Sequence, residues 1–418
     1  MQPSSPIKRL GRWLWRPRIS LRGLLILVSL VSVVFFGVAS VRRAYERDSE
    51  AQWSLATTLG FTFESDTILP SWVFHFIARE RLRWFERASS AQCARLAVDG
   101  AMKFRHKPEE LESFQRISDC RHLQLLWIEG LAINDQQLST IANLRHLEHI
   151  HLNSLEINGE SLRVLLELPN LRGVVIKNCP FEPSSLVVFS EIRRLRALTL
   201  AGFEVSSLHL RNLDVSELQA LSLSETLVDD AISPLLARCE KLVALNLNGC
   251  KVTDATVSQL KNCRLLQSLF LDRTLVTGSG FEELTHLDLG IVHLEGSQLD
   301  DAGAEALAKV QSVELLVISR TKITAKGLKR LASLPKLIDL KADEVSLDPT
   351  ALDGIKFVGP LSELSLNDSG IDDRGVGALL AISRPLAKLS VRRCSISRVG
   401  KARLRAKHKQ VYASYASH

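Results

Sequence analysis

The sequence lacks the short motifs that identify most enzymes and metalloproteins. Its 418 residues contain no Gly-rich phosphate loop, no nucleophile elbow, no metalloprotease helix and no paired-carboxylate motif. The seven cysteines are odd in number and include no Cys-x-x-Cys pair, so they predict neither a zinc site nor a complete disulfide framework. We therefore expect no catalytic residue, no bound metal and no cofactor.

An excess of positive charge is also missing from most of the chain. The formal net charge is +7, and residues 1–50, with nine Lys and Arg against three acids, contribute +6 of it, which leaves +1 for the remainder. The basic balance therefore reports one short segment and not a broad surface for nucleic acid. No nucleic-acid partner is expected.

One stretch shows the unit from which most of the chain is built. Residues 242–263 read Leu-x-x-Leu-x-Leu-x-x-Cys-x-Val, followed by a polar pair and then by Val257, Leu260 and Cys263. The first half alternates apolar and polar side chains, as a strand with one buried face does, and the second half places apolar residues three apart, as on one side of a short helix. Such a unit cannot bury its apolar face alone, so it requires copies on either side.

Twelve copies are present, 23 to 25 residues apart. They start at Leu123, Leu147, Leu171, Leu195, Leu218, Leu242, Leu266, Leu289, Val313, Leu337, Leu361 and Leu386. The pattern resembles the leucine-rich-repeat family, whose signature is matched well by residues 218–228, 242–252 and 313–323. The polar pair and the helix are most similar to the subclass related to ribonuclease inhibitor and the cysteine-containing repeats. This resemblance implies an α/β solenoid, a horseshoe of about twelve repeats over residues 93–397.

Three positions of the repeat carry small polar residues with predicted structural tasks. Eight residues after the start, small donors are expected to bond the buried backbone: Cys179, Thr226, Cys250, Thr274, Ser297, Thr321, Ser369 and Cys394. Eleven residues after the start, all but Glu182 are good helix N-caps: Asn134, Asn158, Ser206, Asp229, Thr253, Thr277, Asp300, Thr324, Asp348, Asp372 and Ser397. The following residue is often an acid that suits the positive end of a helix: Asp135, Asp230, Asp254, Asp301 and Asp373.

One uncharged apolar run near the N-terminus predicts a membrane anchor. Leu24 to Val41 is 18 residues long, which is enough for a transmembrane helix and more than the apolar core of a signal peptide. Six basic residues precede it, whereas three basic residues and three acids follow closely. The positive-inside rule therefore puts residues 1–23 in the cytoplasm and the repeats on the exoplasmic or periplasmic side of the inner membrane. The opening resembles that of bacterial membrane-anchored proteins; the alternative is a cleaved signal peptide, with Gly37 and Ala39 before the cut.

Two segments separate this run from the repeats. Residues 42–54 are polar and charged and are interpreted as a stalk. Residues 55–92 are rich in aromatic side chains and are interpreted as a cap that covers the first repeat. Within them, residues 69–77 loosely resemble an F-box, which gives the alternative of an intracellular substrate adaptor in a ubiquitin-ligase type of complex. The predicted membrane span directly upstream argues against that alternative.

The C-terminal segment, residues 398–418, contains a basic stretch. Residues 398–409 include no acid, and we expect a capping helix over the last repeat, with Val399 and Leu404 facing inward. The alternative is a surface for phosphate, anionic lipid or an acidic partner.

Cysteine and histidine receive structural interpretations. Cys93, Cys120, Cys239 and Cys263 precede strands at positions that other repeats fill with leucine, so all the cysteines are expected to be free, mostly buried thiols. His149 and His151 are expected to share the solvent side of one strand, close to His146. A metal site there is the alternative to a solvated face, and the sequence offers no third strong ligand.

The strand pattern also predicts where a partner binds. Residues two, four and six positions after each start point away from the core, onto the concave side of the sheet. The side chains there are varied, whereas the inward positions are nearly uniform, so we expect a non-enzymatic protein that binds a protein partner through this face. Trp127 and Phe270 are the expected aromatic anchors. The alternative is that each makes a lateral contact with the neighbouring strand, or with the N-terminal cap in the case of Trp127. The candidates are Trp127, Glu129, His149, His151, Asn246, Asn248, Phe270, Asp272, His293, Glu295, Lys341 and Asp343.

Overall fold

The computed structural model describes residues 101–104, 114, 117–119, 123–179, 182–202, 204–348 and 350–413. Every described residue belongs to one compact unit, Ser54–His418. The segments predicted to be a membrane helix (24–41), a stalk (42–54), an aromatic cap (55–92) and an F-box-like motif (69–77) lie outside the described residues. Among the described residues, no helix is long and apolar enough to cross a bilayer.

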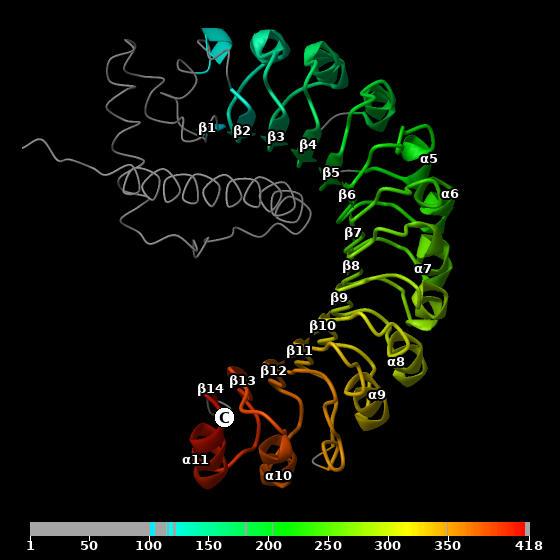
Figure 1. Ribbon diagram of the computed structural model, residues 1–418. Coiled ribbons are helices and arrows are strands. Elements are labelled where there is room, and N and C mark those ends of the chain that lie inside the picture. Colours follow the sequence, from blue (N-terminus) through cyan, green and yellow to red (C-terminus); the bar gives the residue numbers. More distant parts are fainter. Residues whose placement is uncertain are drawn as a thin grey trace, which may run out of the picture. The chain divides into compact units, whose positions relative to one another are not determined.

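The described repeats contribute their strands to one parallel sheet, in which each strand pairs with its neighbours in the sequence (Figure 1). Pairing runs from one repeat to the next in constant register, so Leu245 lies opposite Leu269. The strands are β1 (Ala101–Phe104), β2 (Leu125–Glu129), β3 (His149–Asn153), β4 (Gly173–Lys177), β5 (Ala197–Ala201), β6 (Ala220–Ser222), β7 (Ala244–Asn246), β8 (Ser268–Phe270), β9 (Ile291–His293), β10 (Leu315–Val317), β11 (Asp339–Lys341), β12 (Glu363–Ser365), β13 (Lys388–Ser390) and β14 (Gln410–Tyr412).

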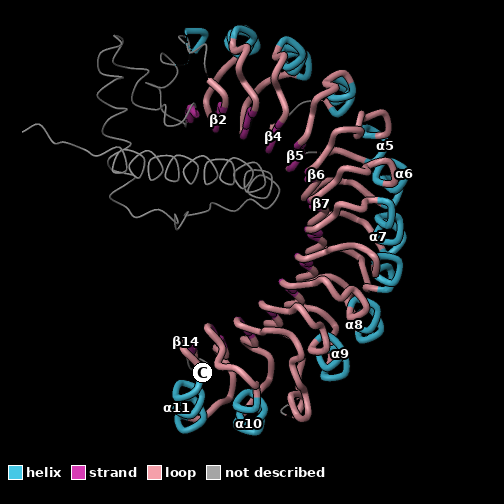
Figure 2. Tube along the Cα trace, in the orientation of Figure 1, coloured by secondary structure: helices cyan, strands magenta, loops and turns pink. Residues whose placement is uncertain are grey.

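Short helices line the outer side of the curved array, and the strands line its inner side (Figure 2). The α-helices are α4 (Asp135–Ser139), α5 (Ser207–Leu210), α6 (Ser233–Leu236), α7 (Asp254–Gln259), α8 (Asp301–Leu307), α9 (Ala325–Leu331), α10 (Asp373–Ala381) and α11 (Arg398–Lys407). The 3₁₀ helices are η2 (Ile117–Asp119), η3 (Thr140–Asn143), η4 (Gly159–Glu167), η5 (Pro183–Ser190), η6 (Asp230–Ile232), η7 (Leu260–Asn262) and η8 (Ser279–Leu284). The α/β solenoid expected from the sequence is confirmed.

The core lies between the sheet and the outer helices. Leu245 and Leu247 are fully buried in the middle of the array, as the alternation in the sequence predicts. The small donors where the strands end bond the backbone as expected: Thr226 Oγ1 donates to the Leu223 carbonyl at 2.6 Å, and Cys250 Sγ donates to the same carbonyl from the next repeat at 3.0 Å. These bonds satisfy a backbone acceptor that would otherwise be buried without a partner.

The predicted N-caps are observed at most helices, and the acids that follow them do more than predicted. Asp254 lies in the first turn of α7, yet its carboxylate accepts hydrogen bonds from the next repeat. Oδ2 accepts from the Thr277 N–H and hydroxyl, at 2.8 and 2.7 Å, and Oδ1 accepts from the Gly278 and Gly280 N–H groups, both at 2.9 Å. Asp135, Asp230, Asp301 and Asp373 bond the following repeat in the same way. These acids therefore couple neighbouring repeats.

The C-terminal end of the array carries a helix and a strand after the last predicted repeat start. Helix α11 packs on α10 and buries Leu404 completely, whereas Val399 is 70% exposed, so its predicted inward orientation is wrong. The chain then forms β14, a strand that the sequence pattern does not predict, because Gln410–Tyr412 is too short to show an alternation. His408, between the two elements, is 3% exposed, and its Nδ1 accepts the Leu386 N–H at 3.0 Å.

The described cysteines are free and buried, as predicted: Cys179, Cys239, Cys250, Cys263 and Cys394. Burial raises the pKa of the Cys239 and Cys263 thiols to about 12, so both are protonated at neutral pH. A buried, protonated thiol is a poor nucleophile and a poor metal ligand. Cys93 and Cys120 lie outside the described residues.

Candidate binding surface on the concave sheet

The concave surface consists of three rows of side chains that cross the strands. Within β2, Leu126 and Ile128 are fully buried toward the core, and the alternate residues Leu125, Trp127 and Glu129 face the concave side. Because neighbouring strands keep one register, Trp127 lies opposite His151, and Phe270 lies opposite both Asn246 and His293. All twelve residues predicted to contact a partner occupy these three rows. Their role in binding stays a prediction.

The two aromatic candidates make lateral contacts within this surface. Trp127 stacks on His151, with ring centroids 4.1 Å apart and an angle of 12° between the planes. Phe270 meets His293 edge-on at 4.7 Å and is 0% exposed, so the expectation of an exposed aromatic side chain is wrong for Phe270. A phenyl ring attracts the edge of a neighbouring ring, and this lateral packing orders Phe270 without a partner.

The outermost row, six positions after each start, forms a hydrogen-bonded ladder. Asn248 Oδ1 accepts the Asp272 N–H at 2.7 Å, and Asp272 Oδ1 accepts the Glu295 N–H at 2.7 Å. Asp343 Oδ1 accepts the Asn367 N–H at 2.8 Å in the same manner. The sequence pattern assigns Asn248, Asp272 and Asp343 to a binding site because the side chains at these positions vary between repeats. These hydrogen bonds show that stacking does use the side chains at the three positions.

Burial controls the ionisation of the histidine candidate nearest the N-terminal end of the sheet. Burial, reinforced by the positive charge of Arg172, lowers the pKa of His149 to about 4, so its imidazole is neutral at pH 7. Three-residue groups of His, Cys, Asp or Glu that could hold a metal ion do not occur among the described residues.

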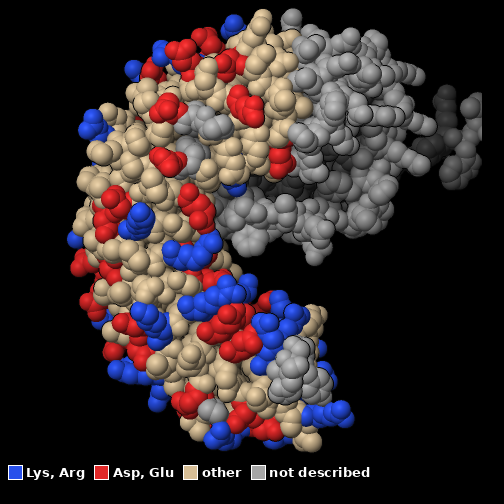
Figure 3. Space-filling view, turned by 180° about the vertical axis from the view of Figure 1, so that it is seen from behind, with Lys and Arg blue, Asp and Glu red and all other residues tan. Residues whose placement is uncertain are grey.

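The C-terminal half of the concave face is strongly charged. Asp339 and Glu363 occupy the row two positions after the start, where Glu363 pairs with Lys388 at 3.5 Å. Burial raises the pKa of Asp339, and the carboxylate of Glu363 adds to that rise, against the opposing charge of Lys341. Lys341 is exposed. Seen from behind, the described surface carries interspersed acidic and basic side chains (Figure 3).

A solved structure that superposes on this chain identifies its architecture. An internalin of Listeria monocytogenes superposes with a TM-score of 0.53 and 20% identity, over 82% of this chain and 95% of that one. This chain has the leucine-rich-repeat fold. A leucine-rich-repeat protein of Leptospira interrogans gives a TM-score of 0.47 at 16% identity, over 71% of this chain and 86% of that one. The TLR13–ssRNA13 complex gives 0.48 at 18%, over 75% of this chain and 50% of that one. No protein-family model and no curated protein matches the sequence.

Sequence reasoning missed part of the concave surface of this leucine-rich-repeat array. Asp339, Glu363 and Lys388 stand two positions after Leu337, Leu361 and Leu386, so the same offset that located His149 would have located them. Tyr412 was not among the predicted concave residues because β14 was not predicted. The guanidinium of Arg392 lies 5.2 Å from the centroid of the Tyr412 ring.

Proposed function

We propose that the protein is a non-enzymatic interaction protein, anchored in the cytoplasmic membrane, that binds a protein partner on the concave face of its repeats. The solenoid architecture supports an interaction role, because such arrays present extended concave surfaces for binding. The sequence supports the anchor through the uncharged run 24–41 and its basic N-terminal flank. In this proposal residues 1–23 are cytoplasmic and the repeats lie on the exoplasmic side.

The charged concave face of β9–β14 carries the proposal. Here Lys341 and Lys388 are exposed, and Asp339 and Glu363 remain partly accessible. Stacking uses the inward leucines and the hydrogen-bonded ladder of the outer row. Of this group of four charges, Glu363 and Lys388 pair with each other between β12 and β13, and Lys341 and Asp339 lie on β11. Side chains of both signs on one concave sheet favour a protein surface with complementary charge over a lipid or a polyanion.

Site-specific photo-crosslinking in intact cells tests the binding face. A photoreactive amino acid at Lys341, on the concave sheet, should capture a partner, whereas the same amino acid at Lys322, an exposed lysine outside the strands, should not. Both positions are exposed, so a difference in capture reports the location of the partner. Equal capture at both positions, or capture at Lys322 alone, would contradict a concave binding site.

Protease accessibility tests the proposed topology. Protease added to intact spheroplasts should degrade the repeats, because they lie outside the cytoplasmic membrane. Protected repeats would reverse the topology. An N-terminus near Ser40 in the mature protein would establish cleavage in place of anchoring.

A further inference from the structure

A pocket of about 280 Å³ opens where the repeat pattern is least regular. The repeat that starts at Leu337 has no helix among its described residues after Asp348, and residues 350–354 form turns instead. The next repeat is the longest, with 25 residues from Leu361 to Leu386. The pocket is lined by residues 357–361 of the first irregular connection and by residues 382–384 of the second.

Backbone hydrogen bonds at the two connections differ from those of the regular repeats. In several other repeats the N–H that starts the repeat closes a tight turn onto the residue three positions earlier, as Leu266 does onto the Cys263 carbonyl at 2.9 Å. Leu386 instead donates its N–H to His408 Nδ1. Val358 donates to the Ala332 carbonyl at 3.0 Å, which holds the first connection against the preceding repeat.

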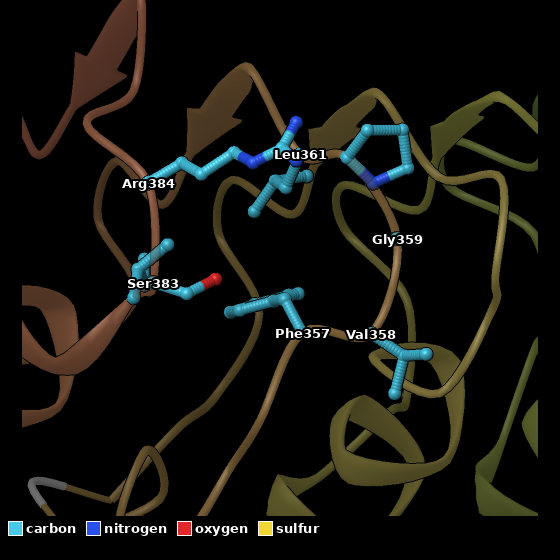
Figure 4. A pocket seen from close by; sticks show the side chains of 8 residues that line it. Phe357, Val358, Gly359, Leu361, Ser383 and Arg384 are labelled. Atoms are coloured by element: carbon cyan, nitrogen blue, oxygen red, sulfur yellow. The ribbon is translucent and has the colours of Figure 1, made fainter.

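Apolar and polar groups both line the pocket, its exposed lining is more polar than apolar, and the Arg384 cation lies at its edge. Leu361 and Ile382 are buried, Phe357 is half-buried, and Val358 is 65% exposed at the rim. The Ser383 hydroxyl points toward the Phe357 ring, and the Arg384 side chain extends over Leu361 (Figure 4).

The Arg384 side chain is exposed, two residues after Ile382, the C-cap of α10. Two carbonyls at this end of α10, those of Leu380 and Ile382, accept hydrogen bonds from Lys407 Nζ, the latter at 2.6 Å. Within the part of the chain that the structure describes, no carboxylate lies within ion-pair distance of Arg384. An arginine with its planar fork of donors at the edge of this cavity is suited to a carboxylate.

We propose that this pocket binds a small hydrocarbon group that bears one carboxylate. The volume lies near the lower end of the range for ligand sites, which fits a single aromatic ring or a branched chain. The hydrocarbon packs against Phe357, Leu361 and Ile382, and the carboxylate accepts hydrogen bonds from Arg384 with the Ser383 hydroxyl beside it. The same chemistry is offered by a free aryl carboxylate and by the C-terminal residue of a peptide.

Ligand-observed saturation-transfer NMR on the full-length protein tests the proposal with 3-phenylpropionate and its neutral amide. The acid should bind at least ~5-fold more tightly than the amide, because a charged hydrogen-bonded pair at a half-open site contributes modestly. Arg384→Ala should abolish that preference. Arg403→Ala, which removes an exposed arginine of α11, should leave it unchanged.

A second variant guards against an indirect effect of Arg384→Ala. Val358→Glu alters an exposed rim residue, so the fold should persist while the new carboxylate competes for Arg384 and weakens binding of the acid ~5-fold. Equal binding of acid and amide, or unchanged binding in both variants, would overturn the proposal.

A peptide ending in Phe and its C-terminal amide distinguish the two sources of the carboxylate. A preference for the free peptide acid over 3-phenylpropionate points to a chain terminus, and the reverse points to a small metabolite.

Discussion

The sharpest prediction concerns Asp254, the acid that joins two repeats in the middle of the array. Asp254→Ala removes an acceptor for three backbone N–H groups and one hydroxyl of the following repeat. A hydrogen bond to a charged group contributes ~1.5–3 kcal/mol, and such contributions do not add when the donors share one partner. Water reaches the site partly, so we expect the free energy of unfolding to fall by ~2–4 kcal/mol.

The geometry also predicts an intermediate variant. Each carboxylate oxygen of Asp254 accepts from two donors, so Asp254→Asn keeps one acceptor oxygen and should lose about half as much stability as Asp254→Ala. Asp288→Ala is the control, because its side chain is 81% exposed and its one partner, Lys336, is 3.8 Å away. That change should cost less than ~0.5 kcal/mol.

Thermal and urea unfolding followed by circular dichroism measure the series. Asp254→Ala should lower Tm by roughly 5–10 °C and broaden the transition, because the array is coupled only through neighbouring repeats. If Asp254→Ala matches Asp288→Ala, the bonds between repeats do not stabilise the array. If Asp254→Asn matches Asp254→Ala, the division of donors between the two oxygens is wrong.

Three further predictions follow from buried groups. Leu247→Ala should lower the free energy of unfolding, measured with urea, by ~2–5 kcal/mol, because it leaves a cavity. The strand pattern alone predicts a near-neutral Asn246→Ala, but this change should cost ~1–2 kcal/mol because Asn246 Oδ1 accepts the Asn248 N–H at 2.9 Å. Equal losses for the two variants would contradict the strand register. Burial, together with nearby Lys407, lowers the pKa of His408. The contribution of His408 to the free energy of unfolding is therefore complete above pH ~6.5 and is lost as pH falls toward the folded pKa. The difference in stability between wild type and His408→Gln should shrink from pH 7.5 to 5, and a constant difference would refute the coupling. Phe270→Ala should lower Tm by several degrees because Phe270 is buried, and an unchanged Tm with lost partner capture would restore it as a binding anchor.

The repeat pattern could be predicted from the sequence because large apolar residues recur at a fixed period. Leu245, Leu247 and their equivalents fill the same inward positions in every copy, and small donors such as Thr226 follow at a fixed offset. The side-chain ladder of the outer row could not be predicted from the sequence. Asn248 and Asp272 look like variable polar residues until the backbone N–H of the next strand is placed within 2.7 Å of each.

The exposure of individual side chains on the concave face also could not be predicted from the sequence. Alternation places Phe270 on the solvent side of the sheet, but it cannot show that the His293 ring packs against it. The pocket beside Arg384 depends on two irregular connections whose backbone paths no periodic pattern specifies. Positions that follow the period were therefore predictable, and those that depend on contacts between particular neighbours were not.

The uneven distribution of the bridging acids gives the array a mechanical character. Asp230, Asp254 and Asp301 clamp their junctions, whereas the equivalent position is Gly278, Ala325 or Pro349 in three other repeats. A pulling force applied at the two ends loads all junctions in series, so extension begins at the junctions without a clamp. An array tethered at one end and bound to a partner along its sheet would thus yield first at the junctions without an acid, after Gly278, Ala325 and Pro349, and the junctions that Asp230, Asp254 and Asp301 clamp would keep their curvature under load.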